Sequence, residues 1–144
     1  MLLNVPYSSD ISVIQSELSR TLTEYLNIGF DPYLDITHEY DKCRVHMDNI
    51  VYLEKCQRVT EIHMTDGKIY RSYIPIYRFE EMLPKSMFHR ISSSAIVNWR
   101  FLVSTRAYRA TIRCNGKLVE LGMWSKDYKW VKAEVIRRNI GSNN

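Results

Sequence analysis

Two dipeptides that favour tight turns constrain the fold of this 144-residue chain more than any other feature of its sequence. Asp66-Gly67 and Asn115-Gly116 each stand between two runs in which polar and apolar residues alternate. Asp-Gly and Asn-Gly pairs tolerate the positive φ angles that two-residue hairpin turns require. The sequence therefore predicts two β-hairpins, whose four strands are residues 59–64, 68–73, 107–114 and 117–121.

Further strands are predicted nearer the N-terminus, where the side chains repeat with a period of two. Residues 33–38 and 42–47 alternate between polar and apolar side chains, which is typical of half-buried strands. The apolar run at residues 50–53 predicts a more fully buried strand. Residues 55–58 are mostly polar, and we expect them to form a connection to the strand that follows.

Three segments have the pattern of helices. Residues 10–27 carry one apolar stripe, which is expected either to pack on the chain's own domain or to form a dimer contact. Residues 75–83 begin at a proline and stop before another, which predicts a short helix lying over a sheet. Asp127 can cap a last helix that ends in two cations, Arg137 and Arg138. The expected fold is therefore mainly β, with a short internal helix and helices at both ends.

The stretch from residue 88 to residue 104 holds two short apolar runs, residues 95–97 and 101–103, which predict buried strands. Three serines and an arginine precede these runs, and Asn98 begins the polar break between them. Serine and asparagine side chains can hydrogen-bond to neighbouring backbone groups, so such breaks are typical of turns. We therefore expect Arg90, the serines and Asn98 on a loop or strand end, held by buried strands on either side.

The charged residues are unevenly distributed, although the net charge is only +4. Residues 1–66 contain five Lys or Arg against eleven Asp or Glu, a sum of −6. No acidic residue lies between Glu81 and Glu120, and this interval sums to +7. A basic segment interleaved with aromatic residues is typical of proteins that bind a polyanion. The alternative is a set of solvated strand faces whose acidic partners lie elsewhere in the fold.

Several functional classes are disfavoured by what the sequence lacks. No apolar run approaches the ~20 residues needed to cross a bilayer, and no secretory signal is recognisable, so we expect a cytoplasmic protein without membrane contact. Three cysteines without CxxC spacing are expected to be free thiols, and four scattered histidines form no metal-ligand pattern. The sequence shows no nucleophile–base–acid set and no phosphate loop. We therefore expect no enzyme, no catalytic residues, no metal, no cofactor and no small-molecule substrate.

Six short motifs occur in a particular order along the chain. They are Asp48-Asn49-Ile50-Val51-Tyr52-Leu53-Glu54, Asp66-Gly67, Phe79-Glu80-Glu81-Met82-Leu83-Pro84, Phe88-His89-Arg90-Ile91 with Ser94 and Ile96-Val97-Asn98, Asn115-Gly116, and Ser125-Lys126. Each motif alone is weak, but their order and spacing are specific. Over about residues 33–138 the chain resembles the LytTR-type DNA-binding domain, which is typically the output half of bacterial response regulators.

The resemblance implies an elongated fold of small antiparallel sheets with little helix. It also implies binding to double-stranded DNA from loops, which enter two successive major grooves at direct repeats. In this chain the three loops would be the connection that holds Arg58, the segment 90–98, and the turn at Ser125-Lys126. The residues expected to contact DNA are Arg58, Arg90, Ser92, Ser94, Asn98, Arg100, Ser125 and Lys126.

These residues have different expected roles. Arg58 and Lys126 carry charges that can meet guanine acceptors in a major groove. Replacing Arg90 or Arg100 with alanine is expected to weaken binding to DNA, because each arginine is expected to contact a phosphate. Asn98 is expected at a strand end, contacting backbone or phosphate, and a plain turn residue is the alternative.

Three positions depart from the family's pattern. Ser92 stands where the family often has histidine, Ser93 where it commonly has a basic residue, and Lys126 where it usually has arginine. Arginine can form a bidentate pair with guanine while lysine supplies a point charge, so base discrimination is expected to be weaker or different there. These differences motivate an alternative function, a protein-interaction module that modulates a partner regulator without productive DNA reading.

The resemblance also divides the chain. We expect an N-terminal helical arm at 1–32, a LytTR-like DNA-binding domain at 33–138 and a flexible tail at 139–144. The arm is too short for a phosphoacceptor receiver domain, which needs on the order of 100 residues. The expected protein is thus a stand-alone bacterial transcriptional regulator, monomeric when free, with two copies that meet on DNA as a possible homodimer.

Overall fold

The computed structural model of the protein describes residues 31–142. By its internal contacts the chain divides into two compact units, Met1–Pro32 and Tyr33–Asn144. The helix predicted at residues 10–27 lies outside the described residues. In the part of the chain that is described, no helix is long and apolar enough to cross a membrane.

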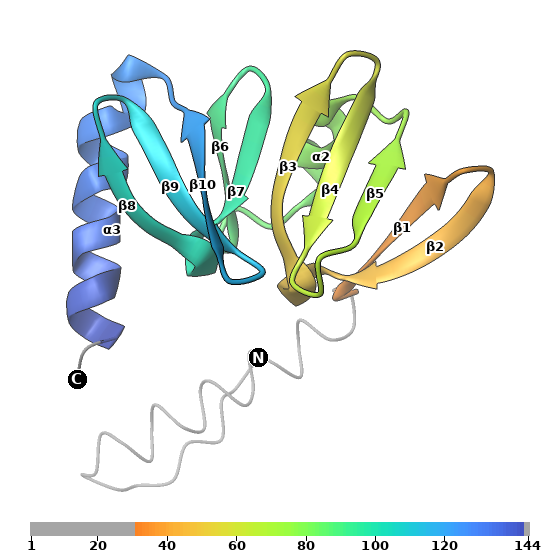
Figure 1. Ribbon diagram of the computed structural model, residues 1–144, viewed down its shortest axis with the longest axis horizontal. Helices are drawn as coiled ribbons and strands as arrows, with labels where there is room; N and C mark the ends of the chain where they lie inside the picture. The colour runs from red at the N-terminus through yellow and green to blue at the C-terminus, as the bar shows by residue number, and fades with distance from the viewer. Residues whose placement is uncertain (1–30, 143–144) are drawn as a thin grey trace, which may run out of the picture. The chain divides into compact units, whose positions relative to one another are not determined.

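Three antiparallel sheets contain the strands of the described residues (Figure 1). The strands are β1 (Tyr33–His38), β2 (Asp41–His46), β3 (Ile50–Cys56), β4 (Val59–Met64), β5 (Ile69–Ser72), β6 (Phe88–Ser92), β7 (Ala95–Asn98), β8 (Leu102–Arg106), β9 (Arg109–Cys114) and β10 (Lys117–Gly122). One sheet pairs β1 with β2, a central sheet has the order β5-β4-β3-β7-β6, and the third has the order β10-β9-β8. This architecture confirms the predicted mainly β fold of small antiparallel sheets.

Two α-helices and three short 3-10 helices complete the described residues. They are η1 (Met47–Asn49), α2 (Ile76–Met82), η2 (Trp99–Phe101), η3 (Ser125–Asp127) and α3 (Tyr128–Ser142). Helix α2 follows Pro75, whose fixed φ suits a helix start, and it matches the predicted internal helix. Helix α3 continues past Arg138, the predicted end of the domain. The amide of Asn139 donates a hydrogen bond to the Val103 carbonyl of β8 (3.3 Å), so this residue is part of the fold and not of a flexible tail.

The central sheet has a hydrophobic core on each of its faces. On one face, α2 contributes the fully buried Phe79 to a core that includes Ile96 of β7. On the other face, Val97 packs in a second core with Val131 of α3. Successive side chains of a strand point to opposite faces, so the apolar run predicted at residues 95–97 serves both cores.

Ala107-Tyr108, predicted as the start of a strand, is a turn, and two connections predicted as loops are shorter than expected. Strand β3 continues to Cys56, so only Gln57-Arg58 remains as a turn before β4. The segment predicted as a loop around Arg90 is mostly strand β6, and the turn itself is Ser93-Ser94. Neither turn contains glycine or asparagine, the residues that mark tight hairpins in a sequence. The structure therefore presents two narrow hairpin tips where the sequence suggested longer loops.

Candidate nucleic-acid interface

Four connections lie at the same end of the domain, which we call the turn end (Figure 1). They are Gln57-Arg58 between β3 and β4, Ser93-Ser94 between β6 and β7, Ala107-Tyr108 between β8 and β9, and residues 123–127 between β10 and α3. Because β9 and β10 run away from this end and back, the predicted Asn115-Gly116 turn lies at the opposite end.

Backbone hydrogen bonds join neighbouring connections at the turn end. The donors and acceptors are Lys55 N to Ser94 O (2.7 Å), Trp124 N to Ile91 O (2.7 Å) and Met123 N to Tyr108 O (2.9 Å). The first of these bonds joins the β3 end to the β6–β7 turn, and the others join the β10–α3 connection to β6 and to the β8–β9 turn. The connections therefore form one continuous surface that backbone hydrogen bonds hold together, as a binding site on rigid elements requires.

Two hairpin tips at the turn end hold side chains in left-handed backbone conformations. Gln57 has a φ of 58°, and Ala107 and Tyr108 have φ angles of 50° and 58°. An L-residue in this region is disfavoured by roughly 1–2 kcal/mol, which is why glycine or asparagine usually occupies such positions. These tips therefore keep side chains where glycine would be easier to accommodate, and strained positions of this kind cluster at functional sites.

The turn end collects most of the residues that the sequence predicts to contact DNA. Six of them lie there or on the strand ends that lead to it, namely Arg58, Arg90, Ser92, Ser94, Ser125 and Lys126. The other two, Asn98 and Arg100, lie at the far end of β7 from the Ser93-Ser94 turn. The set is therefore divided between the two ends of the domain.

Arg58 and Lys126 are the exposed cations of the outer two connections. Arg58 occupies the second position of the β3–β4 turn, and no acidic side chain of the described residues forms an ion pair with it. Lys126 lies in η3, and its Nζ is 4.5 Å from the centre of the Trp124 ring. A cation over an indole face is attracted to the ring quadrupole, so Trp124 holds the lysine at the surface. Both charges are thus presented to solvent.

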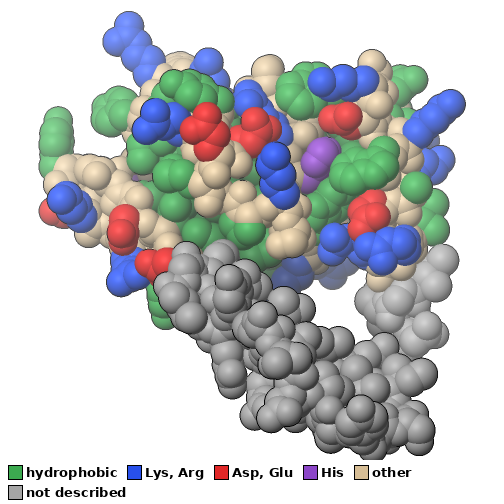
Figure 2. Space-filling view, turned by 180° about the vertical axis from the view of Figure 1, so that it is seen from behind, with side chains coloured by type: hydrophobic (Ala, Val, Ile, Leu, Met, Phe, Trp, Pro, Cys, Tyr) green, Lys and Arg blue, Asp and Glu red, His purple; other side chains and the backbone are tan. Residues whose placement is uncertain are grey.

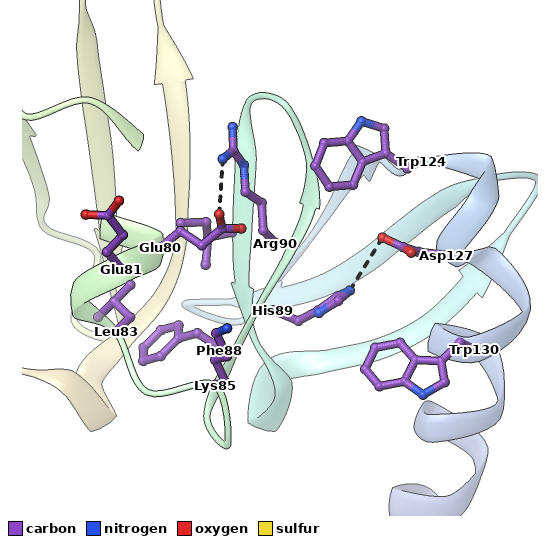
Figure 3. Close-up of a pocket in the computed structure, with 11 residues that line it drawn as sticks. Glu80, Glu81, Leu83, Lys85, Phe88, His89, Arg90, Trp124, Asp127 and Trp130 are labelled. Atoms are coloured by element: carbon purple, nitrogen blue, oxygen red, sulfur yellow. Dashed lines mark hydrogen bonds and ion pairs between the residues drawn. The ribbon is translucent and has the colours of Figure 1, made fainter. Parts of the chain in front are cut away.

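Arg90 is bound within the protein and is not a free cation (Figure 3). Its Nε donates to the Ser92 carbonyl (3.0 Å), and its Nη2 donates to the Ser93 carbonyl (2.9 Å). Its Nη1 lies 3.4 Å from Glu80 of α2, and its guanidinium lies 5.8 Å from the centre of the Trp124 ring. Only 17% of its side chain is exposed. Arg90 therefore fixes the Ser93-Ser94 turn, which we call the middle turn, against α2 and Trp124.

The serines of the middle turn support one another. The hydroxyl of Ser92 accepts a hydrogen bond from the Ser94 backbone N–H (3.2 Å) and lies 3.4 Å from the Ser94 hydroxyl. Ser92 and Ser94 are half-buried, while Ser93 is exposed at the tip. Exposure thus singles out Ser93, which the sequence analysis did not include among the DNA-contacting residues. The sequence predicts a turn among the three serines but not its exact position, and that position is what exposes Ser93.

The side chain of Asn98 bonds to backbone groups on both of its sides, as the turn chemistry of an asparagine at a strand end allows. Its side chain is 2% exposed, its Nδ2 donates to the Ile50 carbonyl (2.9 Å), and its Oδ1 accepts from the Arg100 backbone N–H (3.0 Å). The amide therefore ties β7 to the start of β3 and caps η2. Because it is buried and bound on both sides, it is not available to a phosphate. Arg100 is exposed, but its guanidinium lies 5.2 Å from the Phe101 ring at the same far end.

A pocket of about 630 Å³ beside the turn end shows how η3 is held (Figure 3). His89 of β6 stacks on Trp99 with ring centres 5.1 Å apart, and its centre lies 4.9 Å from that of Trp130 of α3. Its Nε2 is 3.8 Å from a carboxylate oxygen of Asp127, the last residue of η3. At this distance the two groups do not hydrogen-bond, and His89 Nε2 has no hydrogen-bond partner among the described residues. The bond that joins the start of η3 to the central sheet runs from the Trp124 N–H to the Ile91 carbonyl (2.7 Å).

Burial of His89 makes the stability of this region depend on pH. Burial lowers the pKa of His89 below its ordinary value of 6.5, although Asp127 and Glu80 act in the opposite direction. The unfolded chain therefore binds the proton more readily, so the neutral histidine contributes its full stability above pH 6.5 and loses it as the pH falls through the folded pKa.

We expect the urea midpoint of unfolding to fall between about pH 7.5 and about pH 5, and to fall less in a His89→Phe variant. Phenylalanine keeps an aromatic ring between the two tryptophans but cannot titrate. Burial also lowers the pKa of His63, so the variant should retain part of the pH dependence. Equal slopes for the variant and the wild-type protein would show that His89 does not set this dependence.

Exposed cations are present along the turn end. Figure 2 shows Lys and Arg side chains along the upper edge of the rear face, where the turn end lies, with Asp and Glu side chains on the same face. The exposed cations of the turn end include Lys55, Arg58, Arg106 and Lys126. Arg109 also lies there, but it is 3.4 Å from Glu120. A surface of this composition can attract a phosphate backbone.

Comparison with known proteins connects this geometry to a family. The family model of the LytTr DNA-binding domain matches residues 41–118, which is more than half of the chain. Among solved structures, the fold is similar to the LytTr DNA-binding domain of a protein described as a methyl-accepting/DNA response regulator from Bacillus cereus. That match has a TM-score of 0.58 and 18% sequence identity, and it covers 74% of this chain and 98% of the other. No curated protein matches the chain. The chain belongs to the LytTR DNA-binding domain family.

Proposed function

We propose that this protein binds double-stranded DNA sequence-specifically, as a bacterial transcriptional regulator, and that the turn end is its contact surface. The observation that carries the proposal is the joining by backbone hydrogen bonds of three connections, Gln57-Arg58, Ser93-Ser94 and residues 123–127, which we call the three tips. The exposed Arg58 and Lys126 lie on the outer two. Membership of a DNA-binding domain family supports the same conclusion.

The three tips have different parts in the proposed contact. Arg58 and Lys126 enter successive major grooves, where each meets the acceptor atoms of a guanine. The middle turn lies between them and contacts phosphate through the Ser93 and Ser94 hydroxyls, because serine binds phosphate readily but specifies bases poorly. Ser125 lies beside Lys126 and is exposed, so its hydroxyl can also reach the DNA backbone. Asn98 and Arg100 have no part in this surface.

The operator that fits this surface is a direct repeat. Each copy of the protein covers one half-site from one side of the duplex, and two copies meet on DNA in the same orientation. Selection from a randomised duplex library tests both statements. We expect an enriched motif present twice in direct orientation, and we expect the logarithm of the affinity for it to fall linearly with the logarithm of salt concentration. Failure of the wild-type protein to bind any duplex at low salt would contradict the proposal.

Arg90 provides a test of how the middle turn is held. Arg90→Ala should weaken binding to the selected site about tenfold, because the turn loses the bonds that fix it. It should leave the slope of log affinity against log salt unchanged, since a phosphate contact adds about 0.9 to that slope and Arg90 makes none. Arg113→Ala is the matched control, because it removes an exposed cation from the opposite end of the domain. A slope reduced by about one in Arg90→Ala would instead assign a phosphate contact to Arg90.

One observation favours a second candidate function. The middle tip presents only serines, with Ser93 exposed, at positions where the family often has histidine or a basic residue. A chain that kept the fold but lost base reading would act as an interaction module on a partner regulator. The same selection decides between the two candidates, because such a module would bind duplex weakly and enrich no motif.

A further inference from the structure

A groove of about 460 Å³ lies beside the Arg58 turn and extends the turn end onto the connection between β5 and α2. Its polar lining includes Lys55, Arg58, Tyr73, Tyr77 and Ser93. No Asp or Glu is among the residues that line it. Two of its lining residues, Arg58 and Ser93, also belong to the proposed DNA surface, so the groove is continuous with that surface.

The two tyrosines lie outside all three of the predicted DNA-contacting loops. Tyr73 is 81% exposed and Tyr77 is 53% exposed, which is unusual for large aromatic residues packed on a sheet. Tyrosine is one of the side chains that donate hydrogen bonds to phosphate oxygens in protein–DNA interfaces. The sequence does not mark these residues, because one follows a strand and the other opens a helix, where an exposed ring has no pattern of its own.

Internal hydrogen bonds fix the backbone that carries the tyrosines. The hydroxyl of Thr60 donates to the Ile74 carbonyl (2.8 Å), and the Ile74 N–H donates to the Ser72 hydroxyl (3.2 Å). Thr60 and Ser72 are almost fully buried, and their strands pair at this position. Tyr73 is therefore presented from an ordered connection, and Tyr77 is presented from the first turn of α2.

We propose that this groove binds the sugar–phosphate backbone of one DNA strand beside the major groove that Arg58 enters. Lys55 supplies charge to a phosphate, the hydroxyls of Tyr73 and Tyr77 donate to phosphate oxygens, and the apolar wall at Pro75 packs against deoxyribose. The cations, the hydroxyl donors and the lack of acidic residues in the lining favour a polyanion as the occupant. A DNA strand is favoured over an acidic peptide because a strand that enters at Arg58 continues directly into the groove. This inference rests on the proposed DNA binding of the turn end.

A pair of conservative substitutions tests the groove without disturbing the fold. Tyr73→Phe/Tyr77→Phe removes only the two exposed hydroxyls, and Tyr40→Phe is the control because Tyr40 is fully exposed in the β1–β2 connection. We expect the double variant to bind the selected duplex about tenfold more weakly, with an unchanged salt slope, and the control to bind as the wild type does. Lys55→Ala should instead reduce the salt slope by about one.

Hydroxyl-radical footprinting shows where the groove contacts DNA. The wild-type protein should protect a few consecutive sugars on one strand next to the Arg58 contact, and the double variant should lose this protection alone. Wild-type affinity and an unchanged footprint in the double variant would overturn the inference and leave the proposed function standing. Absence of duplex binding by the wild-type protein would overturn both. Tyrosine-dependent binding of a polyglutamate peptide, with duplex affinity unaffected, would assign the groove to an acidic partner and also overturn the inference.

Discussion

Replacing Asn98 with alanine is expected to lower the free energy of unfolding by about 2–4 kcal/mol. The buried amide bonds the Ile50 carbonyl and caps η2 at the Arg100 N–H, so its removal leaves one buried acceptor without a partner and one helix end without a cap. Urea unfolding measures the loss. The folded variant should keep the base preference of the wild-type protein, because its turn end is unchanged.

Arg100→Ala is the control for this experiment. Its backbone N–H remains and only an exposed side chain is removed, so its stability should stay within about 0.5 kcal/mol of wild type. An Asn98→Ala protein with wild-type stability and reduced affinity for every duplex would contradict this account. It would restore Asn98 to the phosphate-contacting role that its place in the sequence suggested.

Replacing both Arg58 and Lys126 with alanine is expected to abolish most of the base preference. Each cation lies on a different outer tip, so each should govern a different position of the half-site, with about 1–3 kcal/mol of discrimination for a good contact. Because the two tips are separate, the effects should be close to additive. Selection on randomised half-sites, carried out with the single and the double variants, measures the loss at each position.

Arg113→Ala is the matched control for both single variants, because it removes an exposed cation from the opposite end. It should leave the selected motif unchanged. Identical motifs from the wild-type protein and the Arg58 and Lys126 variants would show that these side chains do not read bases. The middle turn or the groove beside Arg58 would then have to carry the specificity.

The fold could be predicted from the sequence where a turn carries its own signal. Asp66-Gly67 and Asn115-Gly116 mark the β4–β5 and β9–β10 hairpins, and both hairpins are present. The turns at Gln57-Arg58, Ser93-Ser94 and Ala107-Tyr108 have no such signal, because non-glycine residues occupy them. The tips that form the candidate interface were thus the least predictable hairpins of the domain.

The candidate site was only partly predictable, because its charges are distributed by strand pairing and not by sequence order. The interval between Glu81 and Glu120, which contains no acidic residue, suggested one basic patch. The strands of this interval, however, run from one end of the domain to the other. Arg106 therefore lies at the turn end, while Arg113 and Lys117 lie at the other. One partner of Arg90, Glu80, comes from helix α2, so no local pattern could reveal that ion pair.

Mapping amide chemical shifts of the isotope-labelled protein as duplex DNA is added tests most directly whether the turn end is the DNA-binding surface. We expect the largest changes at Arg58, Ser93 and Lys126, and little change at Arg100 and at Asn115-Gly116. The measurement reports on both ends of the same molecule under one condition. The largest changes at Arg100 and Asn115-Gly116, with the three tips unaffected, would place the DNA at the opposite end and contradict the account.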